Sequence, residues 1–211
     1  CSKGIETLSG ITSQDINSSI LVGLVVSIVG FSLIILRQPI SLSQAVVGGL
    51  IGLGLAQHNL QWQILGKVFL CWFFTPIGAG VVAVICYKIL LTIFSSMEIG
   101  ILTRETLIRR GLISSGILSA YALGANNVAN TVGIFAGAWE GVSNIELAFL
   151  GSISIGIGAL LFSKPIMMNI GKRIVVLDGF SALVAVLSSG ITVYIFSLVG
   201  VPVSITQAIV G

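Results

Sequence analysis

Residues 39–48 have the sequence PISLSQAVVG, and residues 202–211 have the sequence PVSITQAIVG. Every Pro, Gln, Ala and Gly of the first segment returns in the second, and each difference exchanges one hydroxyl or one aliphatic side chain for another. The two copies lie 163 residues apart. Matched Pro- and Gly-interrupted apolar segments in two halves of a hydrophobic chain are typical of transporters, where they mark the binding site. The duplication therefore predicts both a repeated architecture and the place where a ligand binds.

Composition places the chain in a lipid bilayer. Of its 211 residues, 55% are hydrophobic and 8% are charged, and the mean hydropathy is +1.12, whereas soluble domains carry about 25% charged residues. Several apolar stretches reach the roughly 20 residues that a membrane-crossing helix needs. We predict an all-α, polytopic transmembrane protein with inverted repeats, broken helices and re-entrant helical hairpins. Because no basic cluster accompanies aromatic side chains, a nucleic-acid partner is not expected.

The apolar runs suggest an order of segments. Residues 1–94 are predicted to be the C-terminal part of a first repeat, 95–111 a charged linker, and 112–211 a second repeat truncated inside its duplicated motif, so that the chain is expected to be an interior piece of a longer one. Within this frame we expect a loop at 1–17, a re-entrant helix–break–helix at 39–57, an interfacial segment at 164–178, and membrane spans at 18–36, 64–94, 112–139, 147–163 and 179–199.

The basic residues give a conflicting orientation. If each span crosses once, one face receives eight basic residues and the other receives only Arg37 and Lys67, which by the positive-inside rule makes the first face cytoplasmic. The same count makes both copies of the motif enter from one face, whereas an inverted repeat needs opposite faces. We give the repeat more weight than the count, and the orientation stays open.

Three asparagines form the first candidate site. Residues 124–131 read GANNVANT inside an apolar run, and an unpaired amide in hydrocarbon costs several kcal/mol. Helix–helix hydrogen bonding is the simpler explanation. The functional alternative is a broken helix that binds a hard cation such as sodium, because Asn126, Asn127 and Asn130 converge at i, i+3 and i, i+4 spacing.

The duplicated motif forms the second candidate site. Pro39 and Pro202 suit the first turn of a helix, and hydroxyl residues follow each of them. A helix N-terminus offers free N–H donors and the positive end of the dipole, which together can hold an anion. Two such ends that meet inside the membrane predict an oxyanion site without Lys or Arg. Two proline-initiated structural helices are the alternative.

These motifs resemble those of the inorganic phosphate transporter (PiT) family, which includes related sulfate permeases. The family carries a GANDVANA-like motif and a PVSTTHAIVG-like motif in each of two inverted halves. The resemblance covers residues 18–211, and it includes residues 172–177, KRIVVL, before the last motif.

The resemblance implies an ion-coupled symporter of inorganic phosphate in the cell membrane. It implies Na⁺ or H⁺ as the coupling ion, no other cofactor, no enzymatic activity, and compatibility with a homodimer. The substrate residues would be Ser41, Ser43, Gln44, Asn127, Ser204, Thr206 and Gln207. The cation residues would be Asn126, Asn127, Asn130 and Thr131.

Three departures from the family pattern bear on coupling. Asn127 stands where the family usually has Asp, and Gln44 and Gln207 stand where it commonly has His. The first departure removes a carboxylate, and the second removes a titrating imidazole from both halves. The GANDVANA-like copy of the first half would lie before Cys1.

Other functions remain as alternatives. A sulfate permease of the same family shares every motif, and an uncoupled anion channel could also use paired re-entrant helices. A membrane enzyme would need carboxylate pairs or a Ser/His pair within the spans, and a structural subunit would need neither motif. Trp62, Trp72 and Trp139 are predicted to be anchors at the membrane interface.

Overall fold

A computed structural model describes residues 2–36, 41–97, 100–139, 141–173 and 178–210. The side chains of Ser2, Phe162, Thr206, Val210 and residues 164–173 lie outside this description. All regular structure within the described ranges is helical, apart from one isolated bridge between Thr12 and Leu60. The helices are α1 (Ser2–Ser9), α2 (Ile16–Ile35), α3 (Leu42–Ala56), α4 (Trp62–Ser96), α5 (Ile101–Val132), α6 (Asn144–Arg173), α7 (Gly179–Val199) and α8 (Ile205–Val210).

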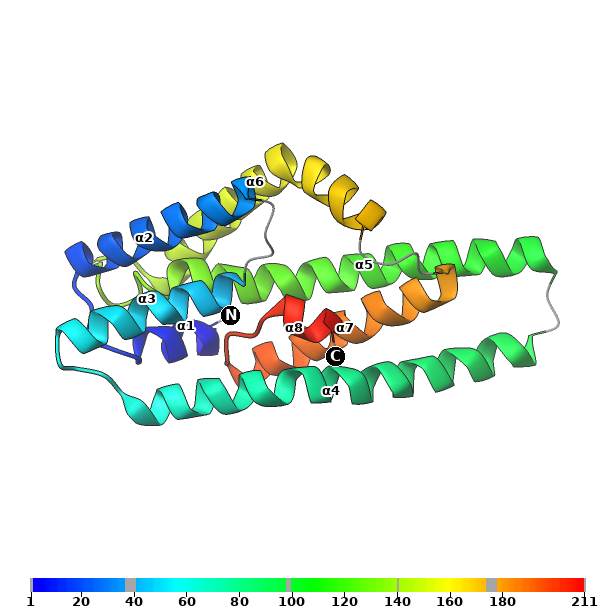
Figure 1. The fold of residues 1–211 in the computed structure, drawn as a ribbon, viewed down its shortest axis with the longest axis horizontal. Coiled ribbons are helices and arrows are strands. Elements are labelled where there is room, and N and C mark those ends of the chain that lie inside the picture. Colours follow the sequence, from blue (N-terminus) through cyan, green and yellow to red (C-terminus); the bar gives the residue numbers. More distant parts are fainter. Residues whose placement is uncertain (1, 37–40, 98–99, 140, 174–177, 211) are drawn as a thin grey trace.

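The two longest helices define the long axis of the molecule. Figure 1 shows α4 and α5 running side by side in opposite directions along most of its length, with α7 lying between them. At 1.5 Å per residue, their 35 and 32 residues span about 52 Å and about 48 Å. Four helices, α2, α4, α6 and α7, contain apolar stretches long enough to cross a membrane.

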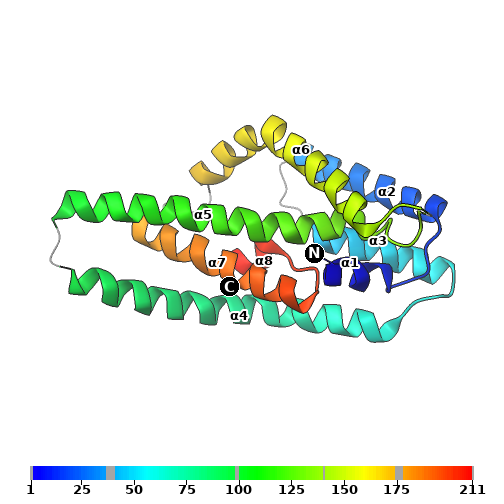
Figure 2. The same cartoon turned by 180° about the vertical axis from the view of Figure 1, so that it is seen from behind.

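Two helical hairpins enter the molecule from opposite ends. In Figure 1, α2 runs inward from the left and α3 returns to the left, whereas α7 runs inward from the right and α8 turns back to the right. Figure 2 shows the same opposition from behind. Helix α2 ends, and α3 and α8 begin, part-way along the long axis of the molecule (Figure 1). This arrangement confirms the prediction of inverted repeats with re-entrant hairpins.

The repeat extends beyond the duplicated motif to the helix caps. Asp15 accepts the backbone N–H of Ser18 at the start of α2, and Asp178 accepts those of Phe180 and Ser181 at the start of α7. Ser41 caps α3 by accepting the N–H of Gln44. The cap residues of each hairpin lie 163 residues from their counterparts, as the motif copies do. Capping side chains satisfy N–H groups that a helix leaves free at its start, so the same chemistry begins each hairpin.

The charge count was wrong about one crossing. It assumed that residues 18–36 traverse the membrane, but α2 ends part-way along the long axis and α3 brings the chain back to the end where α2 began (Figure 1). The hairpin as a whole is therefore re-entrant, and the two motif copies approach from opposite ends of the molecule. Within it, the expected break inside 39–57 is also wrong, because α3 is one continuous helix from Leu42 to Ala56. Arg37, Pro39 and Ile40 lie outside the described residues.

Three other segments differ from expectation. Residues 1–17 are not a plain loop, since α1 buries Ile5 and Leu8 and the chain after it buries Ile11. The linker predicted at 95–111 is shorter, because α5 already begins at Ile101 and its first turns carry the charged residues. Helix α6 continues beyond 163 to Arg173. In each case tertiary packing or continued hydrogen bonding extends a helix into a polar stretch.

The core lies where the hairpins meet, and the outer surface is apolar. One cluster of buried aliphatic side chains joins α1, α2, α3 and α4, and a second joins α4, α5, α7 and α8 around Val203. Long apolar side chains such as Ile28, Phe73 and Leu160 are exposed along the outer faces of the helices. Exposed apolar surface on this scale is the surface that a bilayer covers.

Candidate functional site

The two motif copies touch at one hydrogen bond. Ser43, in the first turn of α3, donates its hydroxyl proton to the carbonyl of Val203, at 2.7 Å. Both residues are almost fully buried. Because the residues are 160 positions apart and come from opposite hairpins, this bond joins the two halves directly.

The asparagines of α5 complete a closed network around this contact. The side-chain amide of Asn126 donates to the carbonyl of Val203 at 2.9 Å and accepts the N–H of Val203 at 3.2 Å. One turn later, Asn130 donates to the hydroxyl of Ser43 at 2.8 Å. The i, i+4 spacing of the two asparagines places them on one face of α5. We call Ser43, Asn126, Asn130 and Val203 the central cluster.

Side chains from two further helices hold the backbone before Val203. Helix α7 ends at Gly200, whose φ of 86° is left-handed, a conformation that favours glycine. Thr7 of α1 donates to the carbonyl of Gly200 at 2.6 Å, and the indole N–H of Trp72 in α4 donates to the carbonyl of Pro202 at 2.7 Å. Non-helical backbone at membrane depth needs such partners. We call residues 200–204 the tip of the second hairpin.

The structure brings together only part of the predicted set. Ser41 and Ser204 are equivalent caps, each 3.4 Å from the N–H of the glutamine three residues later. Gln44 is exposed and Gln207 is half-buried. Asn127 is half-buried and does not join the central cluster, and Thr131 donates to the carbonyl of Asn127 in its own helix. The side chain of Thr206 lies outside the described residues.

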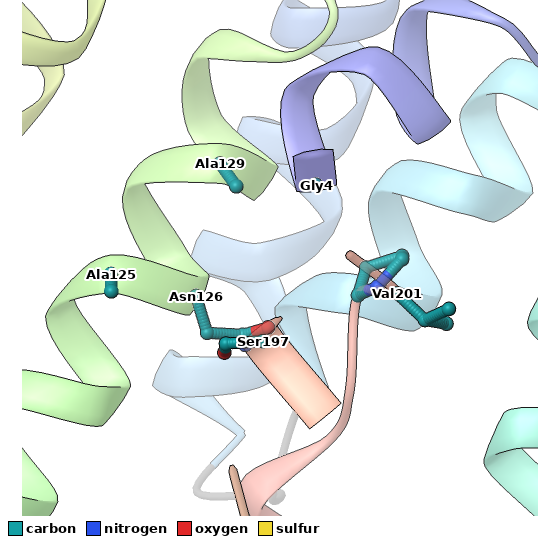
Figure 3. A pocket seen from close by; sticks show the side chains of 7 residues that line it. Gly4, Ala125, Asn126, Ala129, Ser197 and Val201 are labelled. Carbon is teal, nitrogen blue, oxygen red and sulfur yellow. The ribbon is translucent and has the colours of Figure 1, made fainter. Parts of the chain in front are cut away.

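Three buried oxygens near the tip have no hydrogen-bond partner among the described residues. They are Oδ1 of Asn130, Oε1 of Gln207 and Oγ of Ser197. Figure 3 shows Ser197 beside Asn126 at a small cavity that Gly4 and Val201 also line. Its volume is about 10 Å³, close to the minimum that holds one water molecule. The buried amide oxygens are the groups available to a cation or to a hydrogen-bond donor of a ligand.

Two local predictions were wrong. Pro202 does not open a helix, because Ser204 is the cap and α8 begins at Ile205. Helix α5 is not broken at the asparagines, since it continues through them to Val132 and the N–H of its cap residue Gly133 still donates to the carbonyl of Ala129. The side-chain amides find partners across the helix interface, so the backbone of α5 keeps its own hydrogen bonds.

The cluster is electrically neutral. Its hydrogen-bonding groups are one hydroxyl, two side-chain amides, and the backbone N–H and carbonyl of Val203, and none of them titrates near neutral pH. The helix caps at the start of α2 and α7 are acidic. Hydrogen bonds from the side chain and backbone of Ser18 hold the pKa of Asp15 below its ordinary value, and those of Ser181 do the same for the pKa of Asp178. Among the described residues no group of three or more His, Cys, Asp or Glu could hold a metal ion.

Comparison with known proteins places this geometry in a family. The profile of the phosphate transporter family matches residues 2–211. The chain belongs to the phosphate transporter family. As a member of this family with several long apolar helices, it is a multi-pass membrane protein.

Individual members of the phosphate transporter family match nearly the whole chain. A candidate phosphate permease of Methanocaldococcus jannaschii is 34% identical over 203 residues, and the match covers 96% of this chain and 64% of that protein. The sulfate permease CysP of Bacillus subtilis is 28% identical over 211 residues, covering 96% of this chain and 58% of CysP. The chain thus spans somewhat less than two thirds of these relatives.

A solved structure shows the same fold. The sodium-dependent phosphate transporter superposes with a TM-score of 0.84 at 18% sequence identity, and the match covers 99% of this chain and 73% of that one. The fold of the phosphate transporter family is therefore retained across the described helices.

Proposed function

We propose that this protein is a secondary transporter that carries inorganic phosphate across the cell membrane by symport with Na⁺ or H⁺. The observation that carries the proposal is the central cluster, in which Ser43, Asn126 and Asn130 converge on the contact between two inverted hairpins. Family membership supports the same function, as do the relatives named as phosphate or sulfate permeases.

The anion would bind to the donors of the central cluster. The hydroxyl of Ser43 and the amide N–H of Asn126 both point at the carbonyl oxygen of Val203. An oxygen of a tetrahedral oxyanion can take the place of this carbonyl, and charge-assisted hydrogen bonds are stronger than neutral ones. We assign supporting roles to Ser41, Ser204, Thr206, Gln44, Gln207 and Asn127, through hydroxyls, amides and the N–H groups that the caps now occupy.

The coupling cation would bind to amide oxygens. Asn130 is fully buried, and its Oδ1 has no partner in the described part of the chain. Hard cations prefer oxygen ligands, and Asn126, Asn127 and Thr131 lie on the same two turns of α5. Because the cluster has no side chain that titrates near neutral pH, sodium is the first ion to test. A co-bound cation offsets the cost of taking an anion out of water.

Sulfate is the alternative substrate. A site made of neutral donors suits a fully ionised oxyanion, and CysP of Bacillus subtilis is a similar protein that is named a sulfate permease. An uncoupled anion channel is a second alternative. It is less favoured because the hairpins close on each other and leave a cavity of only about 10 Å³ at the tip.

The test is uptake of radiolabelled phosphate by the protein reconstituted in liposomes. We expect saturable uptake that requires an inward sodium or proton gradient and that unlabelled sulfate inhibits weakly. Stronger inhibition by sulfate would favour the sulfate permease, and flux independent of both gradients would favour the channel. No saturable flux of either anion under either gradient would contradict the proposed function. A homodimer stays a prediction, to be checked by the mass of the protein in detergent.

A further inference from the structure

The carbonyl of Pro202 receives a hydrogen bond from an unexpected residue. Trp72 is only partly buried, and sequence reasoning placed it at the membrane interface. In the structure its indole N–H instead points inward from α4 and donates to Pro202 at 2.7 Å. Proline has no N–H of its own, so its carbonyl is the one backbone group through which Pro202 can be held.

This bond holds one side of a peptide unit whose other side is held by Asn126. The carbonyl of Pro202 and the N–H of Val203 belong to the same planar peptide. Trp72 donates to the carbonyl, and Asn126 accepts the N–H at 3.2 Å. In a trans peptide these two groups point in opposite directions, so Trp72 and Asn126 hold the peptide from opposite sides.

The orientation of this plane decides how the side chain of Asn126 is turned, because the plane presents the Val203 N–H to the Asn126 amide oxygen. The carbonyl of Val203 accepts both the hydroxyl of Ser43 and the amide of Asn126. That carbonyl belongs to the following peptide, whereas the N–H that Asn126 accepts belongs to the peptide that Trp72 holds. If the Pro202–Val203 peptide rotates, Asn126 loses this N–H, so Trp72 fixes, through the backbone, the direction in which Asn126 donates.

We propose that Trp72 is a positioning residue for anion binding. It sets the plane of the Pro202–Val203 peptide, and through the Val203 N–H of that plane it aligns Asn126 toward the anion. The inference rests on the proposed function, since it assigns Asn126 to the anion. The inference concerns only the hydrogen bond of the indole. The Trp72 ring also packs edge-to-face on Phe69, with 5.5 Å between ring centroids, and a test must leave this packing in place.

The substitution Trp72→Phe separates the hydrogen bond from the packing. Phenylalanine keeps an aromatic ring beside Phe69 and removes the N–H. We expect the KM for phosphate uptake to rise roughly threefold to tenfold, the effect of losing one hydrogen bond, while the maximal rate stays within about twofold. The matched control is Trp62→Phe, because Trp62 lies on the same helix and is 70% exposed. A purely structural role would instead lower the amount of folded protein and leave the KM unchanged.

Fluorescence gives a second readout that does not depend on the variant at position 72. The 211 residues contain three tryptophans, so the Trp62→Phe, Trp139→Phe double variant leaves Trp72 as their single tryptophan, which is excited selectively at about 295 nm, beyond the absorption of tyrosine. When an anion displaces the Val203 carbonyl, the adjoining peptide moves and the environment of the indole N–H changes. We expect added phosphate to shift or quench the emission with the same concentration dependence as uptake.

The outcomes separate this inference from the proposed function. Absence of saturable uptake by the unmodified protein would overturn the proposed function, and the inference with it. Normal uptake with an unchanged KM in Trp72→Phe would overturn the inference alone. If Trp72→Phe does not fold, the double variant decides. Constant Trp72 emission over the phosphate concentrations that saturate its uptake would overturn the inference as well.

Discussion

Ser43 in the first hairpin donates its hydroxyl proton to the carbonyl of Val203 in the second, across 2.7 Å and 160 residues of sequence. The same hydroxyl accepts a hydrogen bond from Asn130. Ser43 thus links its own hairpin both to α5 and to the second hairpin, because its hydroxyl accepts from Asn130 and donates to Val203. The equivalence of the two motif copies does not require such a bond, which forms only because the hairpins approach from opposite ends.

Ser43→Ala should weaken both folding and transport. The substitution leaves the buried Asn130 amide without its acceptor, which costs about 1 to 3 kcal/mol. We expect a lower melting temperature in detergent and a higher KM for phosphate. Ser154→Ala is the matched control, because the hydroxyl of Ser154 is exposed and bonds within its own helix. Equal effects of the two variants would contradict the role of Ser43.

Asn126→Asp and Asn127→Asp should have opposite outcomes. A carboxylate at 126 has no N–H to donate to the Val203 carbonyl and places a charge in a buried site, so we expect uptake to fall by at least about tenfold. Asn127 is half-buried outside the central cluster. A carboxylate there should be tolerated and should lower the sodium concentration for half-maximal uptake, roughly threefold to tenfold for about 1 kcal/mol of added attraction. The comparison is made by uptake at varied sodium. An unchanged sodium dependence in Asn127→Asp would remove Asn127 from the cation site.

Gly190→Ala should destabilise the protein by disturbing the contact between α5 and α7. A Cβ at Gly190 would lie 3.1 Å from the Cα of Ser119 and would collide with the Ser119 side chain. Overpacking of this kind typically costs 1 to 3 kcal/mol. Thermal unfolding in detergent measures the loss. Gly158→Ala on α6 has open space around the added methyl group, so it should be neutral or stabilising by up to about 1 kcal/mol. A similar loss in both variants would point to a general intolerance of alanine.

The acidic caps predict a loss of stability at low pH. The folded pKa of Asp15 and that of Asp178 lie below the ordinary value of 3.8. A lowered folded pKa contributes stability above the unfolded value, and this contribution disappears as the pH falls through the folded value. The melting temperature should therefore drop below about pH 4. In the Asp15→Asn, Asp178→Asn double variant the drop should be smaller, because asparagine caps a helix without a charge.

The control for the pH experiment is Glu105→Gln, an exposed site on α5. The control should keep the full acid transition. If the double variant and the control show the same transition, the caps do not cause it.

The side chains of the site could be predicted better than its backbone. Ser43, Asn126 and Asn130 were found because polar residues inside apolar runs need partners, and the repeat marks where such partners meet. Val203 was missed because any residue can supply a carbonyl, so its role left no trace in residue type. Thr7 and Trp72 were missed for a related reason, since each acts on a carbonyl far away in sequence.

Some missed features did leave a signal. The pattern Asp-x-x-Ser precedes an apolar run at 15–18 and again at 178–181, which is how a capped helix begins. Ile5, Leu8 and Ile11 recur every three residues, a helical spacing in an otherwise polar stretch. The end of α2 part-way along the long axis had no such signal. Its 20 residues are long enough to cross a bilayer, and only packing against α3 shows that the chain turns back.

Helix α4 has a mechanical role that follows from its length. Near its start, Leu65 and Val68 pack into the core of the first hairpin, and farther along it touches α7 and α8 of the second. One helix, continuous through its interior Pro76, thus contacts both hairpins. A tilt of α4 would move Trp72 and pull on the Pro202 carbonyl, so that a movement of this helix would displace the tip of the second hairpin.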